Sequence, residues 1–174
     1  AECEASPTRA AALEVEAARV HAERLLAPDA AMAALDRALA YEQANLSALD
    51  TRWRLLFRRG RAEEAAAAMG TLAERLGDSA ARAAMLRRQA EMLEWQLKRP
   101  REALVAVERA LGLGRFPGMV ATELAQERLL DLVGRHGDAA ALQLARLGPT
   151  VSRALEAATG AIGRRLDLAT RLPD

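Results

Sequence analysis

The sequence is poor in cysteine, lysine, isoleucine and aromatic residues. Cys3 is the only cysteine among 174 residues, so an internal disulfide is excluded and nothing indicates an oxidising compartment. Aromatic residues make up 3% of the chain, and Lys98 and Ile162 are the only residues of their types. The 51% hydrophobic content is therefore mostly Ala and Leu, which favour helices. This composition predicts a soluble, all-α protein.

Charge and hydropathy argue against two further classes of protein. The chain has 25 Lys and Arg residues against 24 Asp and Glu residues, which gives a formal net charge of +1. A nucleic-acid-binding domain of this size usually has a stronger basic excess, so we expect no nucleic-acid partner. No apolar run approaches the roughly 18 residues of a membrane helix, and the N-terminus lacks the layout of a signal peptide. We therefore expect no membrane association and a cytoplasmic location.

Residue types that carry catalysis or bind metals are scarce and scattered. Cys3, His21 and His136 are the only soft ligands, and no CxxC or HxxxH spacing occurs, whereas a structural zinc site needs four ligands. A nucleophilic pair of Cys3 and His21 would require a fixed geometry, which a polar leader does not offer. The segment "GLGRFPG" contains no phosphate-binding pattern and is typical of a loop. We expect no catalytic residue, no cofactor, no metal and no enzymatic activity.

Proline, glycine and capping residues divide the chain into nine expected helices. Ser6 before Pro7 is typical of an N-cap followed by proline at the first helical position. Gly60 is expected to end a helix, and Asp78 to cap the next one. No segment alternates between apolar and polar residues for long enough to predict a strand. The expected helices span residues 7–26, 28–44, 46–59, 62–76, 79–98, 100–111, 119–133, 138–147 and 150–172.

Two pairs of segments match each other at nearly equal distances along the chain. "APDAAMAALDRALAYE" over residues 27–42 returns as "RPREALVAVERALGLG" over residues 99–114, an offset of 72. "RLLFRRGRAEEA" over residues 54–65 returns as "RLLDLVGRHGDA" over residues 128–139, an offset of 74. The two matches interleave, so they predict a unit of two helical hairpins, each of about 34 to 38 residues.

Small residues recur where the second helix of each expected hairpin would cross the first, at Ala31, Ala65, Ala103 and Ala139. In this feature the chain resembles the tetratricopeptide repeat (TPR) family over residues 7–147, and "LEWQLKRPREALVAVERAL" is similar to arrays in large bacterial proteins. The family's Trp-Leu-Gly-Tyr pattern is absent from the first helices. A plain helical bundle is the alternative, because short Ala and Leu patterns also arise by chance in Ala-rich helical chains.

The resemblance implies one domain over residues 1–174, folded as a right-handed α-solenoid. Its four TPR-like antiparallel hairpins would cover residues 7–45, 46–77, 79–114 and 118–147, and a C-terminal helix over 150–172 would cap the array or begin a further hairpin. In such arrays the first helices of successive hairpins line a concave groove. The inward positions carried over from the resemblance are Glu16, Val20 and Glu23, then Asp50, Arg54 and Phe57, then Arg88, Met92 and Trp95, then Leu124, Arg128 and Asp131.

The expected partner-binding residues in the middle of this groove combine aromatic, apolar and basic side chains, which are common interface anchors. The alternative for Phe57 and Trp95 is packing in the core, because an error of one residue in register rotates a side chain by about 100°. The partner would be another protein or peptide with apolar and acidic residues. The six residues are Arg54, Phe57, Arg88, Met92, Trp95 and Arg128.

Five arginines lie close together in the sequence, and we expect most of them to form salt bridges on a solvated surface, with Glu63 or Glu64 as partners. The alternative for part of this cluster is binding of an acidic peptide. The cluster consists of Arg52, Arg54, Arg58, Arg59 and Arg61.

The function predicted from these features is a non-catalytic protein–protein interaction scaffold. The sequence does not begin with Met, which suggests a piece of a larger protein or a processed form. A regulatory or spacer region of a larger bacterial enzyme or signalling protein is therefore the alternative. A free-standing enzyme is the least favoured class, because no site could be assembled.

Overall fold

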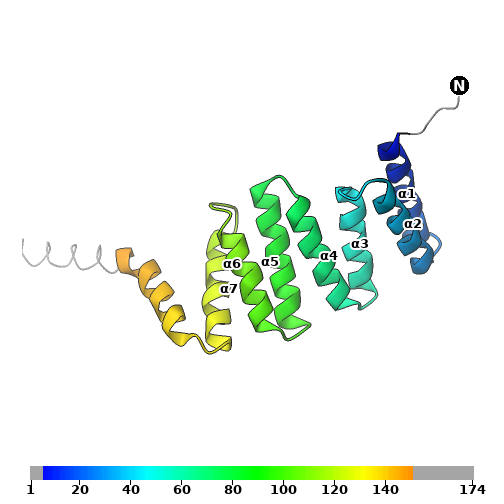
Figure 1. Cartoon of the computed structure of the whole chain (residues 1–174). Coiled ribbons are helices and arrows are strands. Elements are labelled where there is room, and N and C mark those ends of the chain that lie inside the picture. The colour runs from blue at the N-terminus through cyan, green and yellow to red at the C-terminus, as the bar shows by residue number, and fades with distance from the viewer. Residues whose placement is uncertain (1–5, 151–174) are drawn as a thin grey trace, which may run out of the picture.

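The computed structural model describes residues 6–150 and is all-α over that range (Figure 1). Seven helices are followed by an eighth helical segment over residues 136–150, and the described range contains no strand. The expected helix over 150–172 lies outside the described residues apart from its first position. The helices are α1 (Pro7–Glu23), α2 (Pro28–Tyr41), α3 (Leu46–Arg58), α4 (Ala62–Arg75), α5 (Ser79–Trp95), α6 (Pro100–Leu111) and α7 (Met119–Leu132).

The helix ends follow local backbone chemistry. The Asn45 side chain accepts a hydrogen bond from the Ala48 backbone N–H at 2.9 Å, and Asp78 caps α5 through the Ala81 N–H at 2.7 Å. Gly60 takes a φ of 72°, the left-handed conformation that commonly follows a helix. The expected roles of Asp78 and Gly60 are therefore confirmed. Ser6 occupies the N-cap position of α1, but its side chain makes no capping hydrogen bond.

Three helices, α1, α2 and α5, end three residues earlier than expected, and α1 and α5 do so for the same reason. Leu26 and Lys98 have φ values of 48° and 55°, which no helix continues through. Each lies two residues before the proline that opens the next helix, Pro28 or Pro100. The backbone hydrogen bonds of the two turns also correspond, from Ala27 N–H to the His21 carbonyl and from Arg99 N–H to the Leu93 carbonyl. The last segment begins at residue 136, two residues before its expected start.

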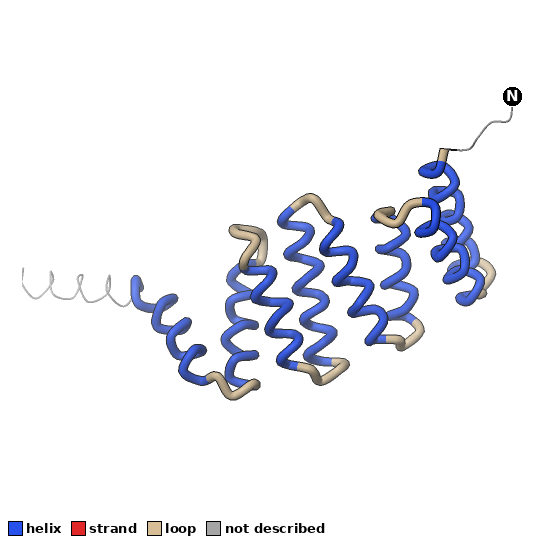
Figure 2. The backbone as a smooth tube through the Cα atoms, viewed as in Figure 1, coloured by secondary structure: helices blue, strands red, loops and turns tan. Residues whose placement is uncertain are grey.

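Each helix packs against the next one along the chain, which gives an elongated row (Figure 2). The strongest contacts join α1 to α2, α5 to α6 and α3 to α4, and we call α1 and α2 the first hairpin. The alanines expected at the crossings are buried in all four cases, because a methyl group lets two helix backbones approach closely. These residues are Ala31, Ala65 and Ala103, which are fully buried, and Ala139, which is 2% exposed.

The apolar core is divided along the row. One cluster joins α1 and α2 to α3 through Ala48 and Leu55, and a larger cluster runs from α3 to Ala139 in the last helical segment. Met32 and Leu39 of α2 are partly buried and pack against both clusters. The first hairpin therefore shares a small core with α3, and Met32 and Leu39 are the partly buried side chains that link this core to the larger cluster.

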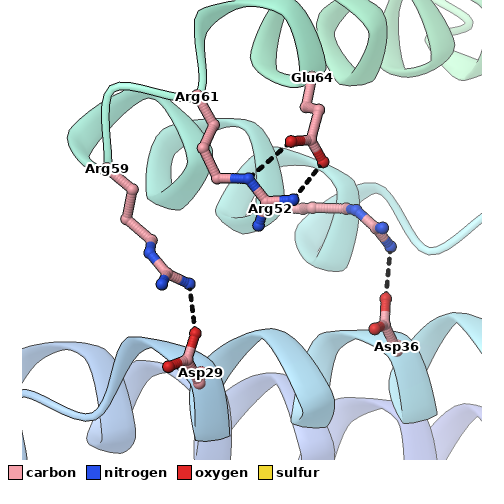
Figure 3. Close-up of polar contacts among 6 residues, drawn as sticks. All are labelled: Asp29, Asp36, Arg52, Arg59, Arg61 and Glu64. Atoms are coloured by element: carbon pink, nitrogen blue, oxygen red, sulfur yellow. Dashed lines mark hydrogen bonds and ion pairs between the residues drawn. The ribbon is translucent and has the colours of Figure 1, made fainter.

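Two ion pairs join the first hairpin to Arg52 of α3 and to Arg59, the residue that follows α3 (Figure 3). Arg52 lies 2.6 Å from Asp36, and Arg59 lies 2.7 Å from Asp29. The two arginines are seven residues apart, as are the two aspartates, so each pair of residues shares one face of its helix. These partners on α2 differ from the Glu63 and Glu64 partners that the sequence suggested, because the contact depends on how two helices pack.

The rest of the arginine cluster divides into paired and unpaired side chains. Arg61 makes the expected salt bridge with Glu64, through two hydrogen bonds of 2.6 Å (Figure 3). Arg54 pairs with Asp50 on its own helix at 2.8 Å. Arg58 makes no ion pair with any carboxylate of the described residues. Part of the cluster is thus the solvated, salt-bridged surface that we expected, and Arg58 stands apart from it.

A bidentate pair in the first hairpin predicts a measurable pKa shift. Arg37 donates two hydrogen bonds to the Glu14 carboxylate, at 2.9 and 2.8 Å, and these lower the pKa of Glu14 below its ordinary value. A lowered folded-state pKa stabilises the fold above the unfolded pKa, and this small contribution is lost as the pH falls through the folded value. Carbon-detected NMR titration should find the low pKa of Glu14, and Arg37→Gln should return it to the normal range. An unchanged pKa in that variant would contradict the pairing.

Candidate functional site: a groove between α3 and α5

A groove of about 580 Å³ lies between α3 and α5, with Met69 of α4 beneath it. Five of the six expected partner-binding residues line it, and Arg128 does not. We call this space the central groove. The side chains that shape it are Trp53, Phe57, Arg58, Arg88, Met92 and Trp95, with Arg54, Met69, Glu91 and Gln96 completing the lining.

The groove has a buried floor and exposed aromatic walls. Trp53, Met69 and Met92 form the floor and are only 6%, 1% and 5% exposed. Phe57 is 43% exposed and Trp95 is 56% exposed. The sequence left open whether these two residues pack in the core or face the groove, and their exposure places them on the groove surface. Met92 belongs to both the groove lining and the apolar core.

Trp53 is held in a fixed orientation under the groove. Its indole Nε1–H donates a hydrogen bond of 2.9 Å to Asp50, which also accepts from Arg54. The guanidinium carbons of Arg54 and Arg88 lie 4.9 and 5.4 Å from the centre of the Trp53 ring, which is the range of a cation–π contact. Our sequence analysis did not place Trp53 in the site. The sequence pattern that could have placed Trp53 in the groove is its spacing, because Trp53 precedes Phe57 by four residues and so lies on the same helix face.

Trp95 contacts two cations and extends the site toward α7. Arg128 lies 5.2 Å from its ring centre and Lys98 lies 5.9 Å away. Arg128 also donates two hydrogen bonds, of 3.0 and 2.6 Å, to the carboxylate of Glu94, whose side chain is 7% exposed. Arg128 therefore lines a neighbouring hollow next to Trp95 rather than the central groove, and much of its hydrogen-bonding capacity serves Glu94.

The charges of the central groove are unevenly neutralised. Arg54 is paired with Asp50, whereas neither Arg58 nor Arg88 forms an ion pair within residues 6–150. Glu91 is the carboxylate of the lining, and it is exposed and makes no ion pair over the same range. The groove thus carries two arginines with free hydrogen-bonding edges and one carboxylate.

Two further hollows continue the groove along α5. One, of about 600 Å³, lies toward the N-terminal ends of α3 and α5 and shares Arg88 and Glu91 with the central groove. The other, of about 290 Å³, lies between α5 and α7 and shares Glu91 and Trp95. Arg87 lines both of them. The three spaces form one surface on which α5 is the central element.

The remaining inward positions lie outside the central groove, although most are exposed to solvent. Val20 of α1 and Leu124 of α7 are 43% and 47% exposed. Asp131 contacts the ring of His136 at 3.1 Å, and His136 is exposed at the first position of the last helical segment. Glu16 and Glu23 are exposed on α1.

The chain matches no protein-family model, no curated protein and no solved structure. The aromatic rings, the buried methionines and the guanidinium groups that line the groove are side chains suited to binding another molecule. Within residues 6–150, no three His, Cys, Asp or Glu side chains lie close enough together to hold a metal ion, and no helix is long and apolar enough to cross a membrane.

Proposed function

We propose that this chain is a non-catalytic protein–protein interaction scaffold whose central groove binds a peptide or helix of a partner protein. In this proposal the row of helices is a right-handed, TPR-like solenoid. Solenoids bury their core between neighbouring repeats and leave a long surface for recognition. The matching turns before Pro28 and Pro100, and the burial of Ala31 and Ala103 at equivalent positions, support the repeat.

One observation carries the functional proposal, namely the exposure of Phe57 and Trp95 on opposite walls of a groove with a buried floor. The chain contains two Phe, one Tyr and two Trp, and three of these five residues line the central groove. Large aromatic side chains next to arginine are the usual anchors of interfaces, and burying exposed apolar surface would favour binding. A fold that used Phe57 and Trp95 only for its own stability would gain more by burying them, as it buries Trp53.

Selection from a random-peptide phage library on the immobilised chain tests the proposal. The enriched peptides should bind the wild-type chain, and Trp95→Ala and Phe57→Ala should each weaken that binding by at least about 1 kcal/mol, or roughly fivefold. Tyr41→Ala is the matched control, because Tyr41 is 53% exposed on α2 and does not line the groove. Circular dichroism should show that all three variants stay folded.

Two results would contradict the proposal. The first is that the selection enriches no peptide. The second is that the enriched peptides bind the folded Trp95→Ala and Phe57→Ala variants as tightly as they bind the wild-type chain. The second result would move the interface to another face of the row.

A further inference from the structure

We propose that Arg58 and Arg88 form a carboxylate-binding pair, and that the partner segment is an acidic peptide whose large apolar side chain inserts between Phe57 and Trp95. This inference rests on the proposed function and specifies the chemistry of its partner. It keeps Arg88 from our sequence-based expectation and differs in one respect, because it assigns the other carboxylate contact to Arg58 rather than to Arg54 and Arg128.

The assignment follows from which arginines already have partners. Arg54 in the central groove donates to Asp50, and Arg128 in the neighbouring hollow donates to Glu94. Arg58 and Arg88 line the central groove without an ion pair in the described part of the chain. A guanidinium with free N–H groups is the best side-chain donor for a carboxylate, which it can hold through two parallel hydrogen bonds. The acceptor that these two arginines lack would come from the ligand.

Arg88 is also preorganised for this contact. It lies over the face of the Trp53 ring, and Trp53 is in turn fixed by its hydrogen bond to Asp50. Stacking uses the flat face of a guanidinium and leaves its N–H edges free to donate. Because the side chain is already restrained, ordering it on binding costs little conformational entropy.

The space along α3 and α5 sets the size of the ligand. The central groove and the hollow next to it together follow α3 from Leu46 to Arg58, a helix of 13 residues and hence about 20 Å. An extended peptide of about six residues would span that length. Arg88 contributes to both spaces, and Arg87 lines the second, so carboxylates on either side of the apolar residue would meet an arginine.

The charges favour an acidic peptide over a nucleic acid. A nucleic acid brings a regular row of phosphates, which needs a continuous basic track. Here Glu91 lies in the middle of the surface and is shared by all three hollows, and Asp50 lies beside it in one of them. A peptide places its one or two carboxylates only where an arginine is free.

The test uses fluorescein-labelled ten-residue Gly-Ser peptides that carry one Phe and two Glu at every relative spacing. Each has a matched peptide with Gln in place of Glu, and oligo-dT of ten nucleotides serves as the nucleic-acid probe. Fluorescence anisotropy measures affinity, and Trp emission reports the site, because Trp53 and Trp95 are the only two Trp residues and both line the groove. At least one Glu peptide should bind and quench Trp emission, and its Gln match should bind at least about tenfold more weakly.

The arginine variants separate this inference from the proposed function. Arg58→Gln and Arg88→Gln should each weaken the Glu peptide at least about fivefold and leave the Gln peptide unchanged. Arg61→Gln is the control, because Arg61 is paired with Glu64 and lies outside the groove. Higher salt should weaken the Glu peptide alone.

The inference would be overturned if no Glu peptide binds, if Glu and Gln peptides bind equally, or if oligo-dT binds more tightly than every Glu peptide. It would also fall if both arginine variants bind like Arg61→Gln. In any of these cases the proposed function still stands if Trp95→Ala weakens the phage-selected peptides, and it falls with the inference if Trp95→Ala does not.

Discussion

Replacing Ala103 with Trp is expected to lower the free energy of unfolding by about 3 kcal/mol, the upper end of the range for an overfilled core. Ala103 is fully buried in the larger cluster, in the first turn of α6, where α6 crosses α5. An indole in place of the methyl group would force the two helix backbones apart, and protein interiors leave no void of that size. The loss is measured by urea unfolding followed by circular dichroism.

Arg99→Ala is the matched control for this variant. Arg99 immediately precedes α6 and makes exposed ion pairs with Glu63 and Glu102. Exposed pairs contribute little, so the control should cost within about 0.5 kcal/mol. Ala31→Trp should cost about as much as Ala103→Trp, since Ala31 is equally buried at the equivalent position of α2. Equal effects of Ala103→Trp and Arg99→Ala would show that the helix crossing is misplaced.

Replacing Arg128 with Ala is expected to cost about 1–3 kcal/mol, because it removes both hydrogen bonds from a buried charge. The Glu94 side chain is 7% exposed and receives these two bonds from Arg128 across the contact between α5 and α7. Without Arg128, Glu94 would be left as an uncompensated charge in a place that water barely reaches. Thermal and urea unfolding measure this cost.

Arg135→Ala is the control, since Arg135 makes ion pairs with Asp138 and Glu108 that are exposed on both sides. It should cost well under 1 kcal/mol. Adding Glu94→Gln to Arg128→Ala should restore part of the lost stability, because a neutral amide is cheaper to leave unpaired than a carboxylate. A double-mutant cycle without coupling between Arg128 and Glu94 would contradict this description. Binding data for any Arg128 variant therefore need a measured stability beside them.

Local chemistry made most of the fold predictable from the sequence. Pro28 and Pro100 open helices, Asp78 caps one and Gly60 ends one, all through effects within a few residues. The early ends of α1 and α5 were not predictable in this way. Leu26 and Lys98 adopt a backbone that non-glycine residues seldom adopt, so neither residue signals a helix end in the sequence. Both side chains are exposed, and each turn is closed by a backbone hydrogen bond, from Ala27 N–H to the His21 carbonyl or from Arg99 N–H to the Leu93 carbonyl.

The candidate site was predictable only in part. Register relative to the buried alanines placed Phe57, Arg88 and Trp95 together, and the structure brings them to one groove. The partners of the arginines could not be predicted, because an ion pair between helices depends on crossing angles that no local pattern encodes. Hence the sequence left open which arginines of the cluster that contains Arg58 would be salt-bridged and which would be available for an acidic peptide. Arg128 was expected to face the groove that it only adjoins.

Pulled from its two ends, the row of helices should yield first between α2 and α3. The ion pairs there have aspartate side chains that are 88% and 59% exposed, so breaking them costs little, and few buried side chains cross the junction. From α3 onward the largest apolar cluster is continuous to Ala139 in the last helical segment, and a further cluster joins α4, α5 and α6. The first hairpin would swing away as a unit while α3 and α5 kept their spacing. A partner that bound both the first hairpin and the groove between α3 and α5 would therefore have one flexible attachment and one rigid attachment.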